Sequence, residues 1–402
     1  MIKLKVSWKQ LYIMCVFLWS LLFTMATETS IPIPYIVYTV SWYAIRMILV
    51  LKITIYDHCK MKKNLISMVL ILVGMLSAHY SESEFLVAFF WFLAAADEIE
   101  IRDIVKALFY AQLIIFICTV VLGTAGFIET KDFIRPQTGV IRHSAGFVHP
   151  NSFAQKAFQI SAMYIYLVGI RVAIKHILLT LLFNYVIYRY TDSNTLWQLT
   201  IIMEAFLILY LISRGKDSLL SNISTWIIRT MKYSCVIIAG VSFWLTLNYQ
   251  DNDVLPGIAS TSTLASRFTQ MYLYFKTYKI KLFGQLLYYH GNSSASSVNY
   301  SGLYTLDNAF VYLILGFGIV VSAIIAILYI GSILKAVKEH EYIILLLFVV
   351  YLIYGFTETA LIRFSYNFTL VFTFAFVWKE NFSKRYALEV KNEEVLDEKT
   401  DS

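Results

Sequence analysis

Charged residues are scarce in this sequence. Asp, Glu, Lys and Arg make up 15% of its 402 residues, whereas hydrophobic residues make up 59%. In soluble globular domains about a quarter of the residues are charged, because the surface faces water. The low charge and a mean hydropathy of +0.66 therefore exclude an ordinary soluble domain and predict an integral membrane protein.

Proline and cysteine are also rare. Four of the five prolines, Pro32, Pro136, Pro150 and Pro256, fall in connections between apolar runs, and Pro34 lies at the start of one. Cys59 is in a charged connection and the other three cysteines are in apolar runs, so no disulfide framework is expected in the outer loops. The sequence also lacks a phosphate loop, a dinucleotide fingerprint, an ATPase motif and metal-type Cys/His spacing. We therefore predict no cofactor and no metal.

Long apolar runs dominate the rest of the chain. A membrane-spanning helix needs roughly 20 apolar residues. Runs of about this length, or somewhat shorter, occupy 10–26, 33–51, 64–80, 85–96, 107–126, 152–170, 176–188, 195–213, 233–249, 307–333, 342–357 and 363–378. The runs 85–96 and 176–188 are short, so re-entrant segments are an alternative there. The pattern predicts an all-α transmembrane bundle of about 12 spans (10–12), forming one domain over 1–378.

Most lysines and arginines fall in alternate connections, which predicts that those connections and both termini are cytoplasmic. The net charge of +7 is thus explained by topology and does not indicate a nucleic-acid partner. The first apolar run lacks a cleavage pattern and is expected to remain as a span. The polar segment 379–402 is predicted to be a disordered cytoplasmic tail.

Two connections on the opposite side, which we call the outer side, are unusually long, at 127–151 and 250–306. Loops of this length tend to be functional. Within the second, apolar residues recur at three- and four-residue steps from Thr263 to Leu282, which predicts an amphipathic helix on the outer membrane surface. The run 291–302 is polar and predicted to be flexible, and Asp307 is a candidate N-cap for the following span.

The stretch "RHSAGFVHPNSFAQKA" (142–157) places polar groups directly before an apolar helix. Pro150 and Asn151 suit the start of a helix, where free N–H groups favour anions. Arg142 upstream and Lys156 one turn into the helix add positive charge, so we predict a diphosphate-binding pocket. Alternatively, Asn151 only caps the helix and Lys156 only snorkels to the interface.

Other outer polar residues complete the candidate set. Glu358, Asp307 and then His149 are the candidate catalytic bases, and Arg267 is a second candidate ligand for a diphosphate. Alternatives remain open: Arg267 as an interface anchor, Asp307 as a simple cap, and Glu358 as an ion-pair partner of Arg363. Secondary candidates are Arg135, Arg189, Asn308, Arg363 and His290. Within the bundle, Arg46 and Glu204 are predicted to pair.

Four stretches appear in order along the chain: "IRHSAGFVHPNSFA" (141–154), "ASRFTQMYLYFKTYKIKLFG" (265–284), "LDNAFVYLILGFGIV" (306–320) and "YGFTETALIRFSYNFTLVF" (354–372). In these stretches the chain resembles the bacterial polysaccharide repeat-unit polymerases of the O-antigen and capsule type, which are related to the O-antigen ligases. The resemblance implies a metal-independent glycosyltransferase in the bacterial cell membrane. Its expected substrates are undecaprenyl-diphosphate-linked oligosaccharides on the outer face, as donor and acceptor, and its expected partners include a chain-length regulator and a flippase.

The same resemblance implies that Arg142 and Arg267 hold the diphosphates. The sequence departs from the family in places: Asn194 stands where many relatives have a Ser-Arg pair, unless Arg189 substitutes, and His290 is a poor match to the catalytic His of the ligases. Polymerisation of repeat units is the leading hypothesis, with a ligase or a lipid-linked oligosaccharide transporter as alternatives. All of these predictions assume that Arg142 and Arg267 converge on one pocket.

Overall fold

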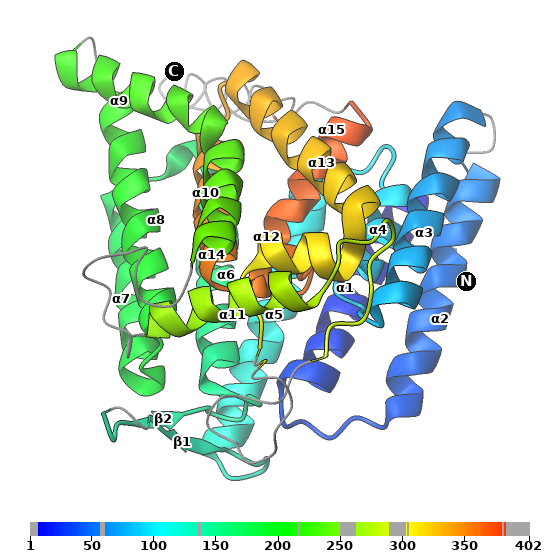
Figure 1. Cartoon of the computed structure of the whole chain (residues 1–402), viewed down its shortest axis with the longest axis horizontal. Coiled ribbons are helices and arrows are strands. Elements are labelled where there is room, and N and C mark those ends of the chain that lie inside the picture. Colours follow the sequence, from blue (N-terminus) through cyan, green and yellow to red (C-terminus); the bar gives the residue numbers. More distant parts are fainter. Residues whose placement is uncertain are drawn as a thin grey trace, which may run out of the picture.

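The computed structural model describes residues 7–56, 61–135, 138–215, 218–249, 263–288, 303, 305–379 and 382, and most of these residues are helical (Figure 1). The helices are α1 (Trp8–Glu28), α2 (Tyr35–Leu51), α3 (Met61–Ser81), α4 (Val87–Ala94), α5 (Ile101–Thr124), α6 (Pro150–Val168), α7 (Ile174–Thr191), α8 (Asn194–Ser213), α9 (Leu219–Thr230), α10 (Ser234–Asn248), α11 (Thr263–Thr277), α12 (Ala309–Tyr312), α13 (Gly318–Lys338), α14 (Tyr342–Thr357) and α15 (Phe372–Val377). Two short strands, β1 (Asp132–Ile134) and β2 (Ile141–His143), form the one hairpin among the described residues.

Seven helical stretches in the described part of the chain are long and apolar enough to cross a membrane: α1, α2 with its extension to Ile55, α3, α5, α8, α9–α10 and α12–α13. The prediction of a polytopic α-helical membrane protein is therefore confirmed, while the predicted number of about twelve spans is not. Two predicted runs form much shorter helices. The run 85–96 gives only the eight residues of α4, and 363–378 is divided between a 3-10 turn (Phe368–Val371) and α15.

The centre of the bundle contains α14 and α4. Helix α14 is buried on all sides from Ile343 to Leu352, and all eight residues of α4 are buried. A helix that is apolar all round belongs in the core. Helix α4 is also held by polar contacts to its neighbours, because Tyr12 on α1 donates to the Phe92 carbonyl and Ser67 on α3 donates to the Ala94 carbonyl.

The first long outer loop contains the β1–β2 hairpin, which the sequence analysis did not predict. The strands are antiparallel, with Phe133 opposite Arg142. In Figure 1 the hairpin lies at the bottom of the molecule, below α7. A bridge between Thr29 and Phe147 connects the end of this loop to the end of α1. Strands of three residues carry almost no periodic signal, which explains why they were missed.

Helix α11 lies within the amphipathic helix predicted in the second long loop, but it ends at Thr277 and not at Leu282. Its apolar residues Phe268, Met271 and Tyr274 are buried. They pack in a cluster with residues of α10 and of the α12 region, such as Leu245 and Val311. The apolar face of α11 is therefore covered by protein. Residues 289–302, which include His290 and the polar run 291–302, lie outside the described part of the chain.

The predicted span 307–333 is interrupted. Helix α12 is followed by a π-helical turn (Leu313–Phe317), and α13 begins at Gly318 with a φ of +81°. Figure 1 shows α12 lying across the direction of α13. Backbone groups freed by such a break need partners, because no lipid group can supply hydrogen bonds at that depth.

The chain segment after α11 supplies those partners. The backbone N–H groups of Ile319 and Val320 donate to the carbonyls of Lys281 and Leu282, at 3.1 Å each. In the other direction, the N–H of Gln285 donates to the carbonyl of Gly316 at 2.9 Å. The segment thereby fixes α11 and the broken helix relative to one another.

Gly284 makes this close approach possible. Its φ is +86°, and a Cβ added there would lie 2.0 Å from the Gly316 carbonyl oxygen. We expect Gly284→Ala to lower the melting temperature in detergent far more than Gly126→Ala. Gly126 has a similar φ of +77°, but a Cβ there would meet nothing within 4 Å. The control variant Gly126→Ala should therefore lower the free energy of unfolding only by the strain of a positive φ, about 1–2 kcal/mol. Equal losses in the two variants would contradict this role for Gly284.

Candidate functional site

Three charged side chains from distant parts of the chain meet where α11, α12 and α14 come together. The Arg267 guanidinium on α11 contacts Glu358, the residue that ends α14, with 2.8 Å between Nη2 and Oε1. Its Nε atom lies 3.6 Å from Oδ2 of Asp307, two residues before α12. All three side chains are largely buried, with 13–29% exposed. We call these residues and the neighbouring Arg363 the Arg267 cluster.

Arg363 contributes a second guanidinium to this cluster. It stacks over the Phe85 ring at 4.1 Å, and its buried Nε atom has no hydrogen-bond partner among the described residues. The expected ion pair between Glu358 and Arg363 is not formed, since Glu358 pairs with Arg267 instead. A guanidinium with a buried, unbonded Nε atom, close enough to act electrostatically on Asp307, is well suited to accept an additional anionic group.

Asn308 and Asp307 have different roles from those predicted. The N-cap of α12 is Asn308, whose Oδ1 accepts from the Val311 N–H at 2.9 Å. The Asn308 side chain also donates to the Phe356 carbonyl and is completely buried, so it joins α12 to α14. Asp307 is therefore not the cap, and its carboxylate is left to face Arg267.

The environment of Asp307 favours its protonated form. Burial raises the pKa of Asp307, and the Glu358 carboxylate raises it further, while Arg267 and Arg363 act in the opposite direction. A general base works best when its pKa is near the operating pH. The raised pKa makes Asp307 a better candidate base than a solvent-exposed aspartate would be.

This pKa shift predicts a pH-dependent stability. The folded state binds the Asp307 proton more tightly than the unfolded state, so stability decreases as pH rises from the ordinary aspartate pKa, about 4, through the raised value. Asp307→Asn removes this titration. We expect the melting temperature of the variant, relative to wild type, to increase with pH across that window, as measured in detergent micelles. Parallel melting curves would show that Asp307 has an ordinary pKa in the folded protein.

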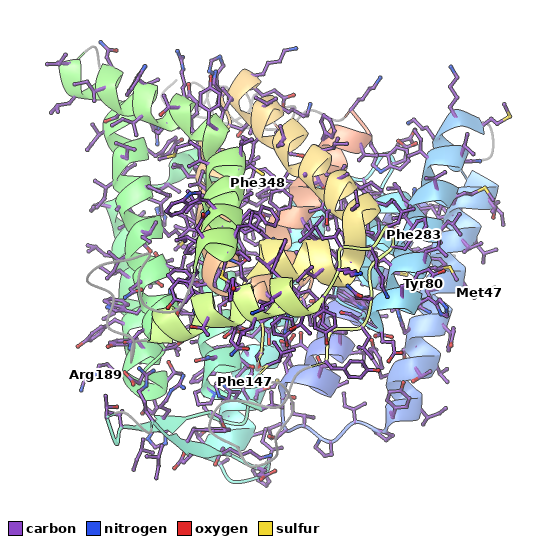
Figure 2. All side chains as sticks on the ribbon, viewed as in Figure 1. Met47, Tyr80, Phe147, Arg189, Phe283 and Phe348 are labelled. Atoms are coloured by element: carbon purple, nitrogen blue, oxygen red, sulfur yellow. The ribbon has the colours of Figure 1, made fainter. Side chains whose placement is uncertain are left out.

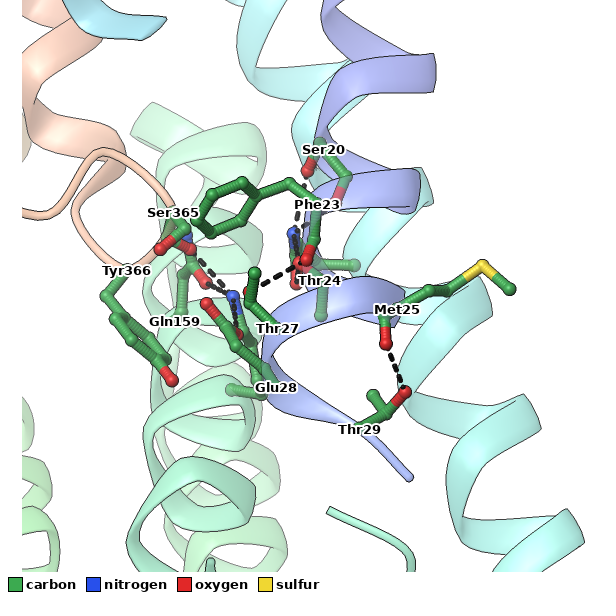
Figure 3. A network of polar contacts seen from close by, with 12 residues as sticks. Ser20, Phe23, Thr24, Met25, Thr27, Glu28, Thr29, Gln159, Ser365 and Tyr366 are labelled. Carbon is green, nitrogen blue, oxygen red and sulfur yellow. Dashed lines mark hydrogen bonds and ion pairs between the residues drawn. The ribbon is translucent and has the colours of Figure 1, made fainter. Parts of the chain in front are cut away.

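Lys156 has a contact that the sequence analysis did not anticipate. Its ammonium is fully buried and pairs with the Glu28 carboxylate at the end of α1, at 2.8 Å. It also donates to the Ser365 carbonyl at 2.7 Å and lies 4.4 Å from the centre of the Tyr366 ring. Figure 3 shows Glu28, Gln159 and Ser365 gathered at this point.

These contacts correct the prediction for Lys156. Its charge is already used to join α1, α6 and the segment before α15, so it is not available to a diphosphate in this structure. Glu28 was not among the site residues predicted from the sequence. A useful signal was present, because a carboxylate at the end of one apolar run can neutralise a lysine inside another.

A double-mutant cycle tests the Lys156–Glu28 pair. Lys156→Met should destabilise the protein by about 3–5 kcal/mol, because it leaves a buried carboxylate without its partner. Glu28→Gln should also destabilise it, whereas the double variant should recover much of the loss. Thermal unfolding in detergent is the measurement. Additive losses in the double variant would mean that the two charges do not interact.

Arg142 belongs to a second group of contacts, around the β1–β2 hairpin. Its Nε donates to the Thr191 carbonyl at 2.7 Å, and its Nη2 donates to the Asn151 side chain. Nearby, Arg135 Nε lies 3.0 Å from Oδ2 of Asp192. Burial lowers the pKa of Arg142, and the positive charge of Arg135 lowers it further. We call Arg135, Arg142, Asn151 and Asp192 the hairpin cluster.

His149 is the N-cap of α6. Its Nδ1 accepts from the Asn151 N–H at 3.0 Å, so the expected capping role of Asn151 is taken by His149. Burial lowers the pKa of His149 to about 4, and the charge of Arg142 contributes to the decrease. The imidazole is therefore neutral at physiological pH and is a weak base. This makes His149 a poorer candidate base than Asp307.

The predicted single pocket is replaced by two clusters. No contact among the described residues links Arg142 to Arg267, and in Figure 1 the hairpin lies at the bottom of the molecule while α11 crosses its middle. Arg189 joins neither cluster. It is exposed on α7, contacts Tyr185 at 3.5 Å, and lies at the edge of the molecule in Figure 2.

The predicted pairing of Arg46 with Glu204 is wrong. Arg46 lies over the Trp42 ring on α2 at 4.5 Å, whereas Glu204 on α8 accepts from Thr180 at 2.7 Å. Helices α2 and α8 are on opposite sides of the molecule in Figure 1. Each group thus has a local partner, as expected for polar groups in an apolar bundle.

An open groove of about 570 Å³ lies beside the segment that fixes the broken helix. Aromatic residues line it, namely Tyr80, Tyr278, Phe283 and Tyr288, with Lys281 and Gln285 among the polar residues. Tyr80 and Phe283 are stacked, with 6.1 Å between ring centres. The groove therefore offers flat apolar surfaces next to polar groups.

Comparisons with known proteins identify no relative: no protein-family model matches the chain, no curated protein matches it, and no solved structure matches it.

Proposed function

We propose that this protein is a membrane glycosyltransferase that polymerises undecaprenyl-diphosphate-linked oligosaccharide repeat units on the outer face of the membrane. The Arg267 cluster is the main support for the proposal. It combines two guanidinium groups with two carboxylates, one of which has a raised pKa, at the predicted outer end of α14. Breaking a bond to a lipid diphosphate requires both kinds of group.

The charges of the cluster suggest a division of roles. Arg267 and Arg363 stabilise the negative charge on the departing diphosphate, as arginine can do without a metal. Asp307 accepts the proton of the attacking sugar hydroxyl, while Glu358 orients Arg267. With both carboxylates ionised the cluster is neutral. Once Asp307 has accepted the proton, the cluster has a net positive charge, which stabilises the negative charge that develops on the departing diphosphate.

Arg142 and Arg267 do not converge on one pocket in the described part of the chain, as the sequence-based predictions assumed, so the two clusters need separate roles. The reaction brings together two lipid-linked chains, and each chain has its own diphosphate. In the described part of the chain, Asp192 is the one acidic side chain shown to act on Arg135 and Arg142, so the hairpin cluster as defined has an excess of positive charge. We assign the diphosphate of the second lipid to the hairpin cluster. The aromatic groove beside Phe283 would then hold sugar rings by stacking.

A transporter for lipid-linked oligosaccharides is the second candidate. It is favoured by the interrupted helix α12–α13 and by the buried Lys156–Glu28 pair, because transporters place broken helices and charged residues at their binding sites. A ligase would use the same chemistry with a different acceptor.

Cells that lack the protein distinguish these functions. Loss of a polymerase leaves single repeat units on the outer-face lipid carrier. Loss of a ligase leaves long chains on that carrier, and loss of a transporter leaves single repeats on the inner face. The size of the extracted lipid-linked glycans separates a ligase from the other two functions, and a membrane-impermeant glycosidase added to spheroplasts shows on which face single repeats lie. We expect single repeats that the enzyme can reach; long chains, or single repeats that it cannot reach, would contradict the proposal.

Substitution of Arg267 tests the site directly. In cells complemented with Arg267→Ala, we expect long polymer to disappear while the protein remains in the membrane at normal levels, because the leaving diphosphate loses its counter-charge. Arg142→Ala should have the same effect. Lys276→Ala is the matched control, since Lys276 is an exposed cation on the same helix α11 and should leave chain length unchanged. Chains of wild-type length in both arginine variants would defeat the assignment.

A further inference from the structure

Helix α9 has its large apolar side chains on the outside. Leu219, Leu220 and Trp226 are 76%, 68% and 67% exposed, and Ile223 is 45% exposed. The side of the helix that faces the protein instead carries the small polar residues Ser221 and Ser224, together with Ile228. This is the reverse of a helix at a water-exposed surface, where the apolar residues face the core.

The helical positions define three faces. With about 100° between successive residues, Leu219, Ile223 and Trp226 fall within roughly 60° of one another. Ser221, Ser224 and Ile228 fall on the opposite side, against the protein. Asn222 and Arg229 form a third, polar face between them, and both are exposed. The face with Ser221 and Ser224 thus contacts protein, the face with Leu219 and Trp226 suits hydrocarbon, and the face with Asn222 and Arg229 suits water.

The orientation of α9 is fixed by contacts at its start. Ser218 caps the helix by accepting from the Ser221 N–H at 3.0 Å. The Ser221 hydroxyl lies 2.9 Å from the Ser213 carbonyl and 3.0 Å from the Gly215 carbonyl, which anchors α9 to the end of α8. At its other end, a 3-10 turn (Met231–Tyr233) leads into α10. In Figure 1, α9 lies across the ends of α8 and α10 instead of continuing either one.

We propose that α9 is an in-plane membrane anchor, with its exposed apolar face inserted at the boundary between lipid headgroups and acyl chains. Helix α8 is by itself long and apolar enough to span the bilayer, whereas α10 reaches that length only together with α9, in the stretch Leu219–Asn248. The change of direction between α9 and α10 leaves α9 at one end of that stretch, anchored to the end of α8. The cations Arg214, Arg229 and Lys232 lie at or near its ends, where they complement lipid phosphates. This inference does not depend on the proposed function.

Tryptophan quenching by brominated lipids measures the depth of this face. Trp244 on α10 is the matched control, because it is also exposed, at 54%, and lies roughly 15 Å along the helix from the start of α10 at Ser234. The protein is placed in vesicles of phosphatidylcholine and phosphatidylglycerol, with bromine either high or low on the acyl chain. The chain has eight tryptophans, so each signal is obtained as the difference between wild type and Trp226→Phe or Trp244→Phe.

We expect Trp226 to be quenched at least twofold more by bromine near the headgroups than by deep bromine, and Trp244 to show the opposite preference. Strongest quenching of Trp226 by deep bromine would mean that α9 is part of a spanning helix. No quenching by either lipid would mean that its apolar face contacts water or another protein. Either of these results would overturn the proposal.

Discussion

A charge inside an apolar helical bundle must have a partner, and this requirement determines how the outer half of the molecule is arranged. The ammonium of Lys156 is completely buried and is neutralised by Glu28, which belongs to a helix more than a hundred positions earlier in the chain. Removing one partner of such a pair is much more costly than removing both. The contact therefore requires α1, α6 and the segment around Ser365 to meet at one place.

The Arg267 cluster follows the same rule with a different result. Arg267 is shared between Glu358 and Asp307, and Arg363 has an unsatisfied Nε atom beside them. In this cluster the charges are paired but remain partly accessible to solvent, because the side chains of Arg267, Asp307 and Glu358 are each partly exposed. The broken helix α12–α13 makes the arrangement possible, because its interruption lets Asp307 and Asn308 approach α14. The same interruption is stabilised by the segment containing Gly284. Fold and candidate site therefore depend on the same few contacts.

Much of this architecture could be predicted from the sequence. The apolar runs identified the membrane class and most long helices, and the three- and four-residue spacing identified α11. The sequence did not predict which surfaces of each helix contact protein and which contact lipid. Periodicity shows that Phe268 and Met271 share a face of α11, but it cannot tell whether lipid or α10 covers that face. The short runs 85–96 and 363–378 failed because hydropathy does not distinguish a buried core helix from a span.

The candidate residues show a similar limit. Arg267, Asp307 and Glu358 were named from the sequence and do meet in space, although no local pattern connects them. Capping was misassigned by one or two positions at both α6 and α12, because neighbouring polar residues are equally plausible caps until backbone angles are known. Lys156 was misjudged because its partner Glu28 lies on another helix. Long-range pairing of charges is what a single sequence does not reveal.

The central claim is that the Arg267 cluster serves the reaction and not only the fold. The double variant Arg267→Met, Glu358→Gln tests this directly, because it removes both charges of the closer ion pair together. Asp307 loses its contact with Arg267 in this variant, but it also loses the repulsion from Glu358 and keeps the favourable charge of Arg363. The measurement is the size distribution of lipid-linked glycan in cells that produce the variant, together with its level in the membrane. We predict normal protein levels with only single repeat units on the carrier. Polymer of wild-type length from this variant would contradict the account.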